Sequence, residues 1–82
     1  MSGDFKQCAQ EILGLAALHA DWYASKHVNE HAALEYVAAK TKFRNEDYQG
    51  AITYALDALD HAVGEFHPDY LLALNLFNES LK

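Results

Sequence analysis

The spacing of the apolar residues is the feature of this sequence that most constrains its fold. Apolar side chains recur three and four residues apart in four successive segments, and no segment sustains the alternation of a β-strand. The helix formers Ala and Leu are also far more abundant than Val and Thr. The sequence therefore predicts an all-α fold of about four antiparallel helices, arranged as hairpins or as an irregular helical bundle in one domain over residues 1–82.

The first helix is expected over about residues 4–25, where Asp4 and Gln7 form a candidate capping box. Its apolar stripe consists of Phe5, Cys8, Ile12, Leu15, His19 and Trp22. Because the next segment contains no Gly or Pro, an uninterrupted helix over residues 4–45 is an alternative. We favour a break near residues 25–29, since a small domain must double back to bury its stripe.

Three more helices are predicted after this break. The second is expected over about residues 29–45. Its apolar face consists of Ala32, Leu34, Tyr36, Val37, Ala39 and Phe43. Asp47 is expected to cap the third helix, and Gly64 suits its end. The stripe of that helix consists of Ile52, Ala55, Leu59, Ala62 and Phe66. Pro68 suits the first turn of the fourth helix, because its missing N–H costs nothing there.

The charge balance argues against nucleic-acid partners and against docking on membranes. Twelve acidic residues stand against six basic ones, which gives a net charge of −6, and the basic residues are scattered along the chain. The longest apolar run, Ile12–Leu18, is far shorter than the ~20 residues that span a bilayer. Cys8 is the only cysteine, so no disulfide can form within the chain. We therefore expect a soluble, cytoplasmic protein that neither inserts into membranes nor binds nucleic acid.

The middle of the chain carries a pattern of the helical-repeat kind. Residues 43–52, Phe-Arg-Asn-Glu-Asp-Tyr-Gln-Gly-Ala-Ile, are followed by Ala55, Ala58 and Leu59. This pattern resembles the turn and second helix of a tetratricopeptide hairpin, in which alanines let two helices approach closely. Residues 64–69, Gly-Glu-Phe-His-Pro-Asp, are similar to the junction between repeats in kinesin-light-chain-like arrays. The family's opening Trp, aliphatic, small and aromatic positions fall on Glu35, Ala38, Ala39 and Lys42, so both aromatic residues are missing here.

A second resemblance covers the segment from Leu34 to Leu59. Its Phe-Arg-Asn and Asp-Tyr runs, followed by spaced alanines, resemble a helical repeat near the carboxyl end of septation ring formation regulators, the coiled-helix proteins of bacterial division. Both resemblances imply helical packing and protein partners, and neither implies catalysis. We accordingly expect a non-enzymatic interaction module or scaffold, with no catalytic residue and no cofactor.

Two rows of potential metal ligands define an alternative function. The first row is His27, His31 and Glu35, and the second is Asp57, His61 and Glu65. Residues four apart lie on one line of a helix, and imidazoles with carboxylates suit Zn²⁺ or non-haem iron. Two facing rows would form the metal site of a small helical bundle. Both rows lie off the apolar stripes, however, which favours solvent-exposed pairs instead. His19, within a stripe, is more simply a core or interface histidine.

The last predicted helix is apolar on more than one face, which predicts an interaction surface. One neighbouring helix can cover only one of these faces, so some leucines are left over. The candidate partner-binding residues are Trp22, Tyr23, Tyr70, Leu72, Leu76 and Phe77. A twofold contact would use the same leucines on both chains, so we expect a homodimer or a larger homo-oligomer. A different protein, or the next repeat of a longer chain, would satisfy the same leucines.

Overall fold

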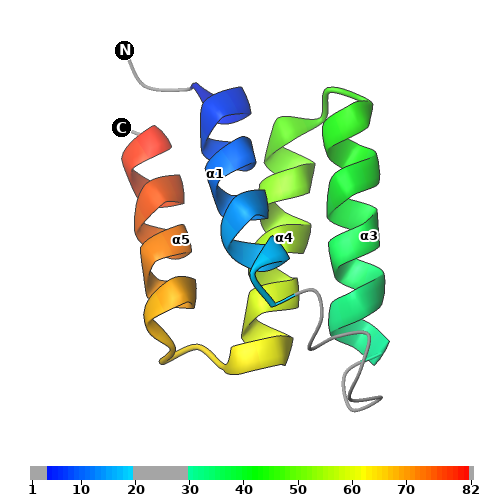
Figure 1. Cartoon of the computed structure of the whole chain (residues 1–82). Helices are drawn as coiled ribbons and strands as arrows, with labels where there is room; N and C mark the ends of the chain where they lie inside the picture. The colour runs from blue at the N-terminus through cyan, green and yellow to red at the C-terminus, as the bar shows by residue number, and fades with distance from the viewer. Residues whose placement is uncertain (1–3, 20–29, 82) are drawn as a thin grey trace.

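The computed structural model describes residues 4–19 and 30–81, and within them every regular element is a helix. The helices are α1 (Phe5–Ala17), α3 (Glu30–Arg44), α4 (Tyr48–Val63) and α5 (Pro68–Ser80). Figure 1 shows that successive helices run in opposite directions, so that α3 and α4 form one hairpin and α4 and α5 another. The predicted all-α fold is confirmed. None of the described helices has the length and apolarity to cross a membrane.

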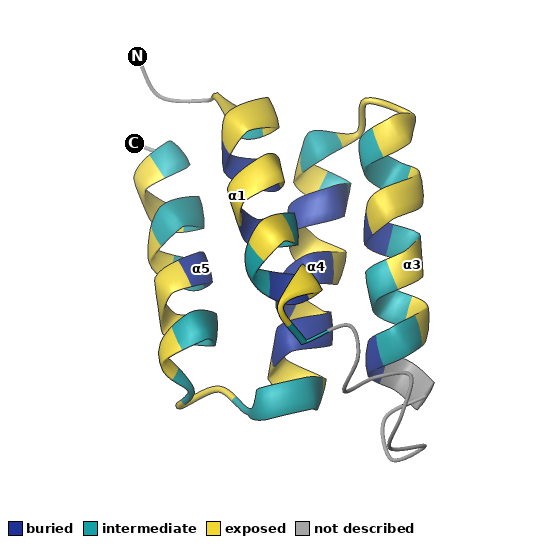
Figure 2. Ribbon diagram, viewed as in Figure 1, coloured by how far each residue is buried: buried dark blue, intermediate teal, exposed yellow. Residues whose placement is uncertain are grey.

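Helix α4 is the centre of the fold, because its contacts with the three other helices are together the most extensive of any helix. Helix α1 packs on both α4 and α5, whereas α3 packs mainly on α4 and lies at the edge (Figure 1). Buried residues are concentrated on α4 and on the sides of its neighbours that face it (Figure 2). The largest side chains with no exposed surface are Ile12, Ile52 and Leu59. Most of the remaining core is alanine, which lets helices approach closely.

Local sequence signals explain the turn between α3 and α4. Asp47 caps α4, because its Oδ1 accepts a hydrogen bond of 3.0 Å from the Gly50 N–H. A Cβ on Gly50 would lie only 2.6 Å from Asp47 Oδ2, so a larger residue here would make the Asp47 side chain shift. Lys42 Nζ, in the last turn of α3, lies 3.6 Å from the same carboxylate. The predicted cap at Asp47 is confirmed.

The junction between α4 and α5 also follows its sequence signals. Gly64 has a φ of 93°, a left-handed conformation that suits glycine, and it ends α4 as predicted. Pro68 stands in the first turn of α5, also as predicted. The cap of α5 was not anticipated: His67 Nδ1 accepts a hydrogen bond of 3.0 Å from the Asp69 N–H. A histidine ring therefore caps this helix, a role that Ser, Thr, Asp or Asn usually has.

The first helix is shorter than the sequence predicts. It ends at Ala17, so both the expected range of 4–25 and the alternative of one helix over 4–45 are wrong. At its end the N–H groups of Leu18 and His19 bond to carbonyls three residues earlier, which tightens the last turn. No Gly or Pro marks this position, so local sequence rules could not find it. The break expected at 25–29 lies outside the described residues.

Two of the predicted apolar faces are narrower than expected. Leu34 and Val37 do not widen the buried face of α3, because they are 67% and 53% exposed on an edge helix that only α4 covers extensively. Phe66 does not continue the stripe of α4, since Gly64 ends the helix before it and leaves its side chain 85% exposed. Ala32 and Ala39 are buried as the spacing predicts, and Tyr36 and Phe43 are partly buried.

Candidate functional site

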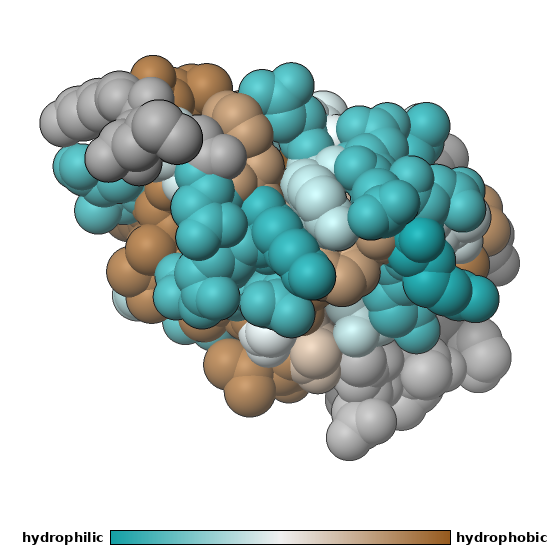
Figure 3. All heavy atoms as spheres, turned by 90° about the horizontal axis from the view of Figure 1, so that it is seen from above, coloured by the Kyte–Doolittle hydropathy of each residue, from teal (hydrophilic) through white to brown (hydrophobic). Residues whose placement is uncertain are grey.

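An apolar groove of about 410 Å³ lies between α1 and α5. Its lining consists of Glu11, Gly14, Leu15, Leu18, Leu72 and Leu76. Seen from above, hydrophobic surface gathers on the left of the molecule, the side on which α5 lies in Figure 1 (Figure 3). The groove is therefore a leucine-walled depression on the surface and not an enclosed cavity.

The groove is open to solvent because leucine side chains on its walls are exposed and a glycine at its floor leaves free space. Leu18 is 72% exposed and Leu72 is 48% exposed, so both side chains stand at the surface. A Cβ added to Gly14 would meet no atom within 4 Å, which shows free space above this part of α1. Glu11 is the charged residue of the lining, and its Oε1 accepts a hydrogen bond of 3.2 Å from Gln7 Nε2.

The structure divides the predicted partner-binding residues into three groups. Leu72 and Leu76 line the groove. Tyr70 and Phe77 are partly buried and pack against the core of the same chain. Trp22 and Tyr23 lie outside the described residues. Leu15 and Leu18, on the opposite wall, were not among the predicted partner-binding residues, because the position of α1 beside α5 is a long-range property of the fold.

One hydrogen bond joins the two predicted rows of metal ligands. His61 Nδ1 hydrogen-bonds to Glu35 Oε1, which joins α4 to α3. Asp57 and Glu65 are exposed, and neither belongs to the group of possible metal ligands found among the described residues. His27 lies outside the described residues, and only the backbone of His31, in α3, is described. A site made from these two rows stays a prediction.

The His61–Glu35 pair is expected to make stability depend on pH. The pKa of His61 is raised above 6.5, first by the hydrogen bond to Glu35 and further by the charges of Glu35, Asp60 and Asp57, against an opposing effect of burial. A raised pKa in the folded state means that the stabilisation is complete below the unfolded-state pKa and is lost as pH rises through the folded-state pKa. Because the His61 side chain is half exposed, the effect is small.

Glu35→Gln tests this expectation, because it keeps the shape of the side chain and removes its charge. NMR titration of the variant should give a lower His61 pKa than in the parent chain. Urea denaturation should show a larger stability difference between the two chains near pH 5.5 than near pH 8.5. An unchanged His61 pKa would show that the hydrogen bond does not persist in solution.

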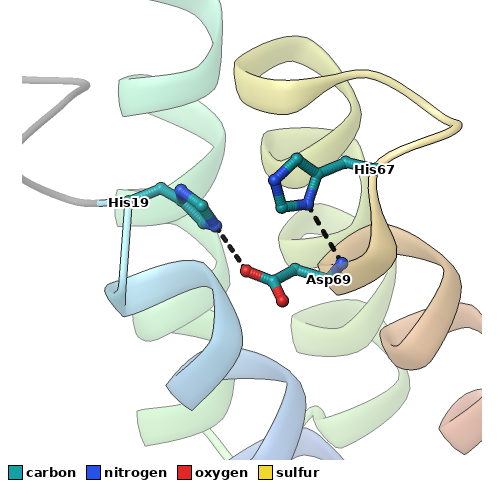
Figure 4. Close-up of polar contacts among 3 residues, drawn as sticks. All are labelled: His19, His67 and Asp69. Carbon is teal, nitrogen blue, oxygen red and sulfur yellow. Dashed lines mark hydrogen bonds and ion pairs between the residues drawn. The ribbon is translucent and has the colours of Figure 1, made fainter.

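A second histidine pair, which the sequence alone did not group, lies where α1 ends and α5 begins, at the lower end of both helices in Figure 1, and Figure 4 shows it in close-up. His19 Nε2 is 2.8 Å from Asp69 Oδ2, and this contact links the end of α1 to the start of α5. The His19 and His67 rings meet edge to face with their centroids 5.5 Å apart. One donor atom from each of His19, His67 and Asp69 lies within 4.8 Å of the other two. The His-Pro-Asp run at 67–69 was the available sequence signal, but nothing local connects it to His19.

The surroundings of this cluster are acidic. The pKa of Tyr70, the residue after Asp69, is raised first by burial and then by the negative charges of Asp60, Glu65 and Asp57. Lys42 and Arg44 lie in the last turn of α3, which is at the opposite end of the molecule (Figure 1). The junction of α4 and α5 therefore favours a cation.

Comparison of the chain with known protein families, with curated proteins and with solved structures gives no match in any of the three searches. The tetratricopeptide and septation-regulator resemblances accordingly stay predictions, and function is inferred from the geometry of the groove and of the histidine cluster.

Proposed function

We propose that this chain is a non-enzymatic protein-interaction module that binds an amphipathic helix of another protein in the groove between α1 and α5. The observation that carries the proposal is the groove itself, with Leu15 and Leu18 on one wall and Leu72 and Leu76 on the other. Monomeric proteins rarely leave a contiguous apolar depression uncovered, and such a patch usually marks an interaction site.

A helix is the occupant whose shape fits two neighbouring helices. The side chains of a third helix can pack into the depression between α1 and α5 by the same ridge-and-groove rules that pack the fold itself. Recognition of this kind uses apolar residues at positions i, i+3, i+4 and i+7 of the bound helix. Gly14 leaves room for a large side chain of the partner at the floor of the groove. The resemblance to tetratricopeptide hairpins, which also implies protein partners, points in the same direction.

The charges around the groove favour a partner with basic residues beside its apolar stripe. Glu11 supplies the charge in the lining, and α5 contains acidic residues but no Lys or Arg. The whole chain carries a net charge of −6. Opposite charges at the rim speed association and orient the bound helix, and their contribution falls as salt concentration rises.

A second copy of this chain is the competing occupant of the groove, because the sequence also predicts a homodimer. It would bring another net charge of −6 and a second Glu11 toward the same groove, which opposes association. We therefore favour a basic partner helix over self-association. Sedimentation of the parent chain and of Leu72→Glu distinguishes the two: a dimer that Leu72→Glu converts to a monomer would assign the groove to a second copy.

Selection from a displayed library of helical peptides of about 16 residues tests the proposal. We expect enriched peptides to carry Leu, Ile or Phe at helical spacing, with Lys or Arg beside them. Leu72→Glu should weaken their binding by roughly 10- to 100-fold, because burying one leucine contributes about 1.5–3 kcal/mol. Fluorescence anisotropy measures the dissociation constants at low and high salt.

Two further variants control this experiment. Leu34→Glu changes a still more exposed leucine on α3, away from the groove, and should leave peptide binding unchanged. Gly14→Met fills the groove from its floor without adding charge, and it should weaken binding while the helical fold persists. Equal losses in Leu34→Glu and Leu72→Glu, or enrichment of peptides that have no apolar stripe, would contradict the proposal.

A further inference from the structure

The cluster where α1 ends and α5 begins carries a second inference, independent of the proposed function. We infer that His19, His67 and Asp69 form a binding site for a divalent metal ion of the Zn²⁺ type. Two imidazoles and one carboxylate come together from segments about 50 residues apart in the chain, and their donor atoms lie within 4.8 Å of one another. The three side chains point toward a common space between the end of α1 and the start of α5 (Figure 4).

The donor set selects the class of metal. Two nitrogen ligands and one oxygen ligand suit Zn²⁺, Co²⁺ or Ni²⁺, whereas Mg²⁺ and Ca²⁺ prefer oxygen ligands alone. Three protein ligands leave a fourth position of a tetrahedral ion open to water. All three residues are partly exposed, so an ion can enter from solvent.

The His19–Asp69 pair needs only a small adjustment to hold an ion, whereas the His67 nitrogen, which lies within 4.8 Å of the other two donor atoms, must approach them more closely. Two ligands of a tetrahedral Zn²⁺, each ~2.0 Å from the ion, lie ~3.3 Å apart. His19 Nε2 and Asp69 Oδ2 are already hydrogen-bonded at 2.8 Å, so they need to separate by only about half an ångström. The proton between these two atoms occupies the place that the metal takes, and in a neutral His19 ring it moves to Nδ1 on binding. No other group is needed to accept it.

His67 caps α5 in the metal-free chain and is also a proposed metal ligand, and it cannot do both at once. In the metal-free chain its Nδ1 accepts the Asp69 N–H and caps α5. A metal bound through either ring nitrogen leaves Nδ1 without a lone pair for this bond, so metal binding breaks the cap. The bound ion would then tie α1 directly to α5.

The chain offers a substitution that separates capping from metal binding. Asn is a good N-cap residue but a poor ligand for Zn²⁺, so His67→Asn should keep α5 intact and remove the metal ligand. His19→Asn and Asp69→Asn remove the other two ligands. His61→Asn is the matched control, because His61 pairs with Glu35 on α3 and is outside the cluster.

Calorimetric titration of untagged full-length protein with Zn²⁺, and visible absorption on adding Co²⁺, measure binding directly. Thermal unfolding with and without Zn²⁺ provides a second readout, since an ion that binds only the folded chain raises Tm. We expect one ion per chain and a raised Tm in the parent protein and in His61→Asn. In His67→Asn, His19→Asn and Asp69→Asn we expect affinity to fall at least tenfold and the shift of Tm to disappear.

Two results with variants would overturn the inference. One is a metal response in His67→Asn as large as that of the parent chain. The other is loss of the response in a His27→Asn/His31→Asn double variant while His19→Asn keeps it, which would assign the metal to the row predicted from sequence. Mg²⁺ is the control ion, and an equal shift of Tm with Mg²⁺ would also contradict a site that contains nitrogen ligands.

Discussion

Leu59→Ala is expected to lower the free energy of unfolding by about 2–5 kcal/mol, which is enough to unfold much of the protein at room temperature. Leu59 has no exposed surface and lies on α4, the helix with the most extensive contacts to the others. Truncation removes buried apolar surface and leaves a cavity that three packed helices cannot easily close. A core of this size contributes only ~3–5 kcal/mol in net stability, so the loss is comparable to the total.

Urea denaturation followed by circular dichroism measures this effect, with Leu34→Ala as the matched control. Leu34 is 67% exposed on the edge helix α3, so the same substitution there should change stability by no more than about 0.5 kcal/mol. Comparable losses in the two variants would mean that α4 is not the centre of the fold. The difference between the variants is more informative than either value, because both make the same change to the unfolded chain.

The sequence predicts the second half of the fold well because its turns carry local chemical signals. The Asp47 carboxylate caps the start of α4, Gly64 ends α4 with a left-handed φ, and Pro68 fits the first turn of α5. Each of these residues acts within a few positions of itself, so its effect can be recognised without knowing the tertiary structure. Both ends of α4 and the start of α5 follow from them to within a residue or two.

The end of α1 could not be predicted, because no local residue defines it. The helix stops where His19 reaches Asp69, a partner 50 residues away. For the same reason the sequence identified Leu72 and Leu76 as leucines without a covering helix. It could not predict which residues form the opposite wall of the groove. The pairing of Glu35 with His61 likewise depends on the register between α3 and α4, which the spacing within either helix leaves undetermined.

Ala55→Leu is expected to destabilise the protein by about 1–3 kcal/mol, although leucine is also a good helix former. Ala55 has no exposed surface and belongs to the same core cluster as Ala39 of α3 and Ala51 of α4. Helices α3 and α4 make the most extensive contact of the fold, and the buried side chains of α3 are alanines. Three added carbon atoms would have to push these helices apart or occupy a strained rotamer.

Ala17→Leu separates this packing effect from any effect of leucine on helix formation. Ala17 is exposed at the last position of α1, so the substitution there should change stability by no more than about 0.5 kcal/mol. Thermal and urea denaturation of the two variants measure the difference. If Ala55→Leu were as stable as the parent chain, α3 and α4 would have room for a larger side chain between them. Close approach of the two helices through alanine would then be wrong.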